Sequence, residues 1–155
     1  MSQLPLSTNQ PPADDAEVHD ALKKSLPRGT LARIPRHPRR RDIILGLISL
    51  SLERRYPYGE IELNDLLSST LSIMDSEVDH VTCRRYLVDF GFLKRDRAGS
   101  RYYLNFPKLE STLALPLESD WAFVLDAWRK ELGRRAASRR ARGNSDQDPA
   151  SGARE

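Results

Sequence analysis

The chain has 155 residues, of which 39% are hydrophobic and 30% charged, so it has room for one domain with a modest core plus tails. Its lone cysteine, Cys83, excludes an internal disulfide and is typical of a reducing compartment. No apolar run approaches the length of a membrane span, and the N-terminus lacks a signal-peptide pattern. We therefore expect a cytoplasmic protein without a membrane partner.

The formal net charge of +3 is too small to imply a polyanionic partner, but its distribution along the chain is uneven. Residues 1–27 carry four acids against two lysines, whereas residues 28–105 carry fourteen Lys or Arg against ten acids. The positive charge is therefore concentrated in patches.

Residues 1–27 are predicted to form an acidic, mostly disordered N-terminal tail in which Asp15–Leu26 favours a short helix. The first strong helical pattern covers Arg39–Arg55, where apolar residues recur at three- and four-residue spacing. A second helix is predicted over Glu60–Leu71, after the turn Tyr56–Gly59.

A third helix is predicted from about Ser76 to Phe90, with Asp75 or Ser76 as its N-cap and Gly91 as the left-handed residue after it. Two short strands follow, over 92–95 and 101–104, joined by a turn near Ala98–Ser100.

Residues 107–142 are predicted to hold a linker and a basic amphipathic helix, and residues 143–155 a disordered tail. An apolar stripe on this helix includes Trp121 and Trp128 and fits either the core or a dimer contact. Its second half has five arginines between Arg134 and Arg142, which is typical of a segment attracted to polyanions.

Together these patterns predict a mainly α fold with a small β-hairpin. The order helix, helix, helix, strand, turn, strand over residues 28–106 is that of a winged helix-turn-helix domain, followed by the C-terminal helix. Several motifs also closely resemble a bacterial family catalogued as domain of unknown function 2087: Arg84–Asp89, Gly91–Leu93, Arg95, Gly99–Tyr102, Glu60–Leu67 and Asp79. The resemblance covers about Leu31–Leu104. Members of that family occur alone or appended to helix-turn-helix transcription regulators, and the family has no established activity.

Nine residues are the candidates for contacting nucleic acid: Arg39, Arg40, Arg41, Thr82, Arg85, Lys94, Arg95, Arg97 and Arg101. Three arginines in the first turn of a helix oppose its dipole, which favours an external anion. Arg85 and Thr82 share a face of the third helix, where arginine can bind guanine O6 and N7. The hairpin has four cations against the single acid Asp96, and such a wing can contact phosphates.

These candidates also have interpretations without a ligand, and for Arg39, Arg40 and Arg41 it is a solvated helix start. Arg85 and Asp89 are four residues apart and could simply pair on a solvated face. Arg84 could be a structural arginine that holds Asp79 or a backbone carbonyl. The hairpin cations could be solvated charges.

No catalytic motif, cofactor-binding loop or paired-carboxylate arrangement stands out, so we expect no enzyme activity and no cofactor. His80 and Cys83 have a spacing that can hold a metal, but no second cluster accompanies them, so no metal site is predicted. We expect a DNA-binding transcription regulator or accessory domain whose partner is duplex DNA. The alternatives are RNA binding, or a protein-interaction or homodimerisation module that uses Trp121 and Trp128.

Overall fold

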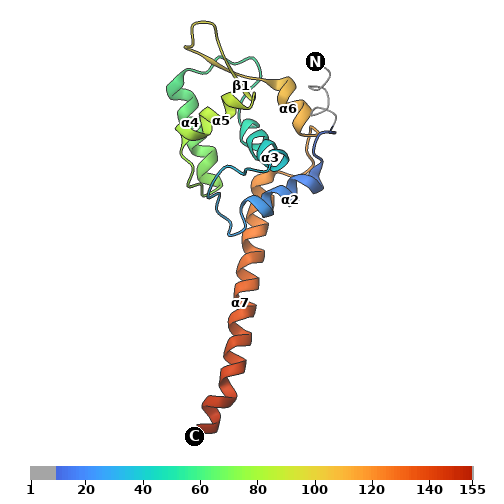
Figure 1. Ribbon diagram of the computed structural model, residues 1–155, viewed down its shortest axis with the longest axis vertical. Helices are drawn as coiled ribbons and strands as arrows, with labels where there is room; N and C mark the ends of the chain where they lie inside the picture. Colours follow the sequence, from blue (N-terminus) through green and yellow to red (C-terminus); the bar gives the residue numbers. More distant parts are fainter. Residues whose placement is uncertain (1–9, 155) are drawn as a thin grey trace.

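The computed structural model describes the backbone of residues 10–154 and the side chains of residues 10–143. In chain order, its elements are α2 (Asp15–Ser25), α3 (Pro38–Ser49), α4 (Glu60–Ile73), α5 (His80–Asp89), β1 (Leu93–Arg95), β2 (Tyr102–Leu104), α6 (Phe106–Thr112) and α7 (Trp121–Arg154). The fold is mainly α with one small antiparallel hairpin, which confirms the predicted class. Figure 1 shows the hairpin at one end of the body and α7 leaving the other.

Helix α3 is the centre of the core. Seven consecutive residues, Ile43–Ser49, are buried, and α3 contacts α2, α4, α5 and α6. A helix that is apolar on all sides must be covered on all sides, which explains this position.

The prediction that this helix runs to Arg55 is wrong, since it ends at Ser49. Beyond it, the Ser51 hydroxyl donates to the Ile48 carbonyl, and Arg55 has a positive φ of 64°. The chain turns here because Tyr58 pairs with Tyr102 through two backbone hydrogen bonds of 2.9 Å, which form an isolated antiparallel bridge beside the hairpin. This pairing is a tertiary contact that helical periodicity could not reveal.

Helix α5 begins at His80, four residues later than predicted, because Asp79 and not Asp75 or Ser76 is its N-cap. The Asp79 carboxylate accepts a hydrogen bond of 2.8 Å from the Thr82 backbone N–H. Asp75 instead adopts a positive φ of 49° in the preceding turn and accepts from the Thr30 hydroxyl. Gly91 follows the helix with φ +86°, as predicted.

The short helix predicted over Asp15–Leu26 is present as α2, but this part of the chain belongs to the packed core and not to a disordered tail. Helix α2 packs on α3 and α7, and Val18, Leu22 and Leu26 are buried in the shared core. Four-residue spacing indicated a helix but could not show that α3 offers it a partner. Residues 1–9, which belonged to the same prediction, lie outside the described residues.

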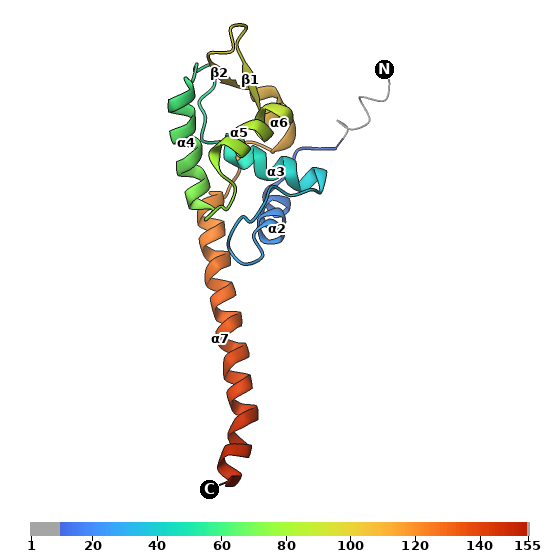
Figure 2. The same cartoon turned by 60° about the vertical axis from the view of Figure 1, so that its left-hand side comes forward.

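The C-terminal region differs from its prediction in two ways. The expected linker contains helix α6, which packs on α3. Helix α7 continues to Arg154, so the structure has a helix where a disordered tail was predicted after residue 142. Figure 2 shows the second half of α7 extending away from the body.

The apolar stripe of α7 packs on its own chain. Leu125 is fully buried, and the buried Trp128 donates from its indole N–H to the Leu26 carbonyl at 2.8 Å. Trp121 is partly buried against the same core. The choice that the sequence left open for Trp128 is therefore decided in favour of the core.

Candidate nucleic-acid interface

The hairpin is held by main-chain pairing and by an organised turn. Leu93 pairs with Leu104 and Arg95 with Tyr102, so the buried Leu93, Tyr102 and Leu104 share the core face. At the turn, the Asp96 carboxylate accepts from the Ser100 backbone N–H at 2.8 Å, the Ser100 hydroxyl at 3.2 Å and the Arg101 backbone N–H at 3.2 Å. The only acid of the hairpin is thus directed into the turn that it stabilises.

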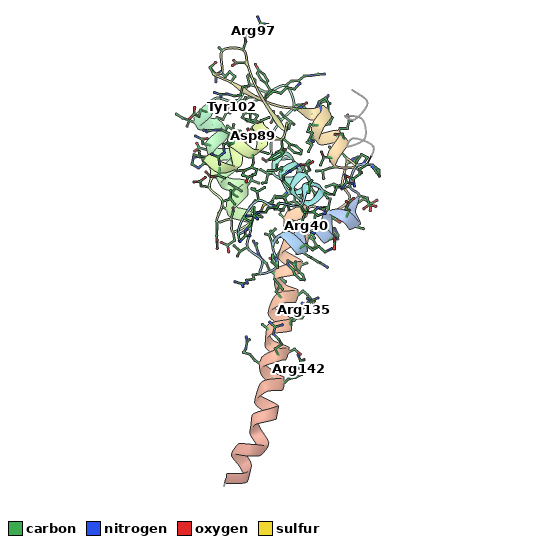
Figure 3. All side chains as sticks on the ribbon, viewed as in Figure 1. Arg40, Asp89, Arg97, Tyr102, Arg135 and Arg142 are labelled. Atoms are coloured by element: carbon green, nitrogen blue, oxygen red, sulfur yellow. The ribbon has the colours of Figure 1, made fainter. Side chains whose placement is uncertain are left out.

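The four hairpin cations, Lys94, Arg95, Arg97 and Arg101, are all exposed. None of them forms an ion pair with any residue whose side chain the structure describes. Arg95 is the most constrained, because it donates to the Gly99 carbonyl at 3.1 Å and lies 5.3 Å from the centre of the Tyr102 ring. Arg97 lies at the hairpin tip in Figure 3. The hairpin therefore presents positive charge without a neutralising partner.

On α5, Arg85 and Asp89 are both exposed, and no ion pair joins them. The structure therefore does not contain the surface ion pair between Arg85 and Asp89. Thr82 differs from Arg85, because it is half-buried and its N–H caps the helix through Asp79. Hydrogen bonds from Thr82, first of all from its backbone N–H, lower the pKa of the Asp79 carboxyl. Of the predicted pair on this helix, Arg85 is the more exposed.

Arg84 is a structural arginine, but its partners are neither Asp79 nor a backbone carbonyl. Its guanidinium donates to the Asn64 side-chain oxygen and lies 3.8 Å from a Glu60 carboxylate oxygen, both on α4. The same guanidinium lies 5.8 Å from the centre of the Tyr102 ring. Arg84 therefore ties α5 to α4 and to the hairpin, at only 17% side-chain exposure.

The three arginines at the start of α3 do not act together. Arg39 forms two hydrogen bonds with the Glu17 carboxylate, at 2.7 and 2.8 Å, and its guanidinium side chain is only 17% exposed. The Arg39 hydrogen bonds lower the pKa of Glu17. Arg41 pairs with Asp42 at 3.0 Å and stacks on Phe90 at 3.7 Å from the ring centre. The prediction that all three contact one nucleic acid is not supported, since two already have internal partners.

Arg40, the middle residue, is half-buried and forms no ion pair among the described side chains. Figure 3 shows Arg40 on the α7 side of the body and Arg97 at the opposite end. The structure therefore brings together the hairpin and α5 but separates them from Arg40.

Cys83 is fully buried, and burial raises the pKa of its thiol to about 12, so it stays protonated and unreactive. Within the described part of the chain, no three His, Cys, Asp or Glu side chains gather as metal ligands would. The helices of that part include none with the length and apolar character needed to cross a membrane.

Residues 30–104 match the family model described as an uncharacterized protein conserved in bacteria (DUF2087). This segment contains α3, α4, α5 and the hairpin, and it agrees with the range over which the motifs resemble that family. The chain thus contains a DUF2087 domain, framed by α2 on one side and by α6 and α7 on the other. Searches of curated proteins and of solved structures found no match.

Proposed function

We propose that this protein binds duplex DNA, as a transcription regulator or an accessory domain of one, through the hairpin and helix α5. The observation that carries the proposal is the set of four exposed, unpaired cations on the hairpin, whose single acid is used to form its turn. Cations that folding does not need are consistent with an external polyanion. The element order α3, α4, α5, β1, β2 also supports a winged helix-turn-helix arrangement.

In this proposal the hairpin positions the domain and α5 reads the sequence. Lys94, Arg97 and Arg101 contact phosphates, which fixes the orientation of the domain without sequence information. Arg85 is the residue that can reach a base edge and bind guanine O6 and N7. Asp89, one helical turn further along, repels phosphate and so favours poses in which the end of α5 stays away from the backbone while Arg85 reaches a base edge.

The test compares two triple charge reversals that change the net charge equally: K94E/R97E/R101E on the hairpin and R139E/R140E/R142E on α7. We expect the hairpin variant to lose more than about tenfold in duplex-DNA affinity at low salt, and the α7 variant to lose much less. Circular dichroism would confirm that both variants fold. Unchanged affinity of the hairpin variant would contradict the proposal, and equal losses would indicate attraction to total charge only.

RNA binding shares the same electrostatics, so the binding assay should include duplex DNA, duplex RNA and single strands in competition across salt concentrations. Preference for duplex DNA supports the proposal. Preference for duplex RNA would contradict it and would indicate phosphate and 2′-hydroxyl contacts across the minor groove, because the major groove of A-form RNA is too deep and narrow for side chains to read.

A second candidate function, homodimerisation, is favoured by one observation on α7. The Phe123 side chain is 72% exposed, whereas Trp121 and Leu125, two residues before and after it in the sequence, pack on the core. Sedimentation of the wild type and of F123A would test it, because a dimer held by this surface should dissociate in the variant. A monomeric wild type at all accessible concentrations would exclude this function.

A further inference from the structure

A second concentration of positive charge lines a pocket far from the hairpin. The pocket measures about 710 Å³ and lies between the end of α2, residues 26–37 and the start of α3. Five cations line it: Lys24, Arg28, Arg33, Arg36 and Arg40. The only acid in the lining is Glu77. A volume of this size is in the range of small-molecule sites.

The arginines of this pocket are not neutralised from within the protein. Among the described side chains, none of Arg28, Arg33 and Arg36 forms an ion pair, and the same holds for Arg40. Lys24 pairs with Asp20 at 3.3 Å, but both side chains are more than half exposed. The neighbouring Arg39 and Arg41 show the contrast, since each has a carboxylate partner. Four like charges around one concavity repel one another unless an anion joins them.

The wall that carries these arginines is held in place by the rest of the fold. The Trp128 indole donates to the Leu26 carbonyl at 2.8 Å, and the Arg129 guanidinium donates to the Gly29 carbonyl at 2.9 Å. On the other side, Leu31 and Glu77 share a backbone hydrogen bond of 2.9 Å. Gly29 has φ +81°, a conformation in which other residues are strained. The backbone of this wall is therefore fixed before any ligand arrives, while the side chains of Arg28, Arg33 and Arg36 are exposed on it. A fixed backbone lowers part of the entropic cost of binding.

We propose that this pocket binds a small molecule with two or more adjoining phosphate groups. Guanidinium groups match phosphate oxygens in pairs, and several of them around one pocket suit a multivalent anion better than a single one. Pro27, Ala32 and Pro35 also line the pocket and offer apolar surface beside the charges. Inorganic pyrophosphate and a nucleoside di- or triphosphate both carry the required chemistry. The proposal does not depend on whether the hairpin binds DNA.

The experiment is calorimetric titration of the full chain, at about 150 mM salt, with pyrophosphate, with ATP and GTP, and with sulfate as the simple anion. We expect pyrophosphate and the nucleotides to bind clearly and sulfate to bind far more weakly. R33Q/R36Q should weaken binding at least about tenfold, because charge-assisted hydrogen bonds are lost. R28Q/R40Q should act in the same direction. Tighter binding of a nucleotide than of pyrophosphate would indicate that the nucleoside contacts the apolar surface of the pocket.

The matched control is K94Q/R97Q on the hairpin, which removes the same charge and should bind pyrophosphate as the wild type does. Each variant should be checked for an unchanged unfolding transition. Equal binding of sulfate and pyrophosphate, or equal weakening by the control, would overturn the proposal. So would a loss of duplex-DNA affinity in R33Q/R36Q as large as in the hairpin variant, because the pocket would then be part of a nucleic-acid surface.

Discussion

The hairpin and the basic pocket have similar numbers of cations, yet they differ in shape and in support. The hairpin stands at the end of the body opposite α7, with Arg97 at its tip, as Figures 1 and 3 show, and its four cations are exposed. The pocket cations surround a concavity whose wall is bonded to α7 and to the turn before α5. Charges along an exposed hairpin suit an extended polyanion, whereas charges around a concavity suit a compact one. Geometry, more than the number of charges, separates the two proposed ligands.

The start of α3 also shows, over three consecutive residues, that surroundings matter more than the number of charges. Arg39 is neutralised by Glu17 and Arg41 by Asp42, while Arg40 lines the pocket without a partner. Equal charges in one helical turn thus have different surroundings. Four predictions, from the largest expected effect to the smallest, test the contrast between the two ends of the molecule.

The largest effect is expected for W128A, which removes the anchor of α7 at the pocket end. Because Trp128 is buried and hydrogen-bonded, the variant should lose about 3–5 kcal/mol of unfolding free energy. F123A on the same helix should change it by less than about 0.5 kcal/mol, since Phe123 is exposed. Urea unfolding measures both. A loss in W128A as small as that expected for F123A would mean that α7 does not pack through Trp128.

The next effect separates two adjacent arginines of α5. R84A should cost about 1–3 kcal/mol of unfolding free energy, because it leaves Asn64 without its donor and removes the contact to α4. R85A should leave stability within about 0.5 kcal/mol and instead reduce the discrimination between duplex sequences. Thermal unfolding and binding to a panel of duplexes would distinguish them. If R84A reduced the discrimination and R85A reduced the stability, Arg84 and not Arg85 would contact the ligand.

A smaller effect is expected for R97Q at the hairpin tip. Losing one phosphate contact should reduce the slope of log affinity against log salt by about 0.9, with little change in sequence preference. Fluorescence anisotropy across salt concentrations gives this slope. The pocket variant R36Q serves as the control and should keep the slope of the wild type. A reduced slope in R36Q but not in R97Q would mean that the pocket, and not the hairpin, contacts the DNA phosphates.

The smallest effect concerns the neutralised arginine beside the pocket. Hydrogen bonds from Arg39 hold the pKa of Glu17 below its ordinary value of 4.5, so the pair stabilises the fold above that pH. The contribution should fade as the pH drops through the lowered pKa of Glu17 in the folded state. Unfolding measured from pH 6 to pH 3 should therefore show a steeper loss of stability in the wild type than in E17Q, which keeps the other carboxyl groups of lowered pKa, such as Asp79 and Asp96. Identical profiles would mean that the pair does not contribute to stability.

Local patterns were sufficient for much of the fold. Apolar spacing identified α2, α3, α4, α5 and the packed part of α7, and Gly91 marked the end of α5. The motifs around Arg84–Asp89 pointed to the family that residues 30–104 match. Helix ends were less predictable. Asp79 and not Asp75 is the N-cap of α5, and the chain leaves α3 early because Tyr58 pairs with Tyr102. Caps and strand pairs compete through contacts that a periodic pattern does not contain.

The sequence by itself determined that the hairpin carries four cations and one acid, because those residues are neighbours in the chain. Only the tertiary structure decided which other arginines are free. Arg39 bonds to Glu17, 22 positions away in the sequence, and Arg84 bonds to Asn64, 20 positions away. Arg33 and Arg36 form no ion pair with any described side chain. Charge depends on residue type, but neutralisation depends on distance in space, and the packing of α2 on α3 and of α5 on α4 sets that distance.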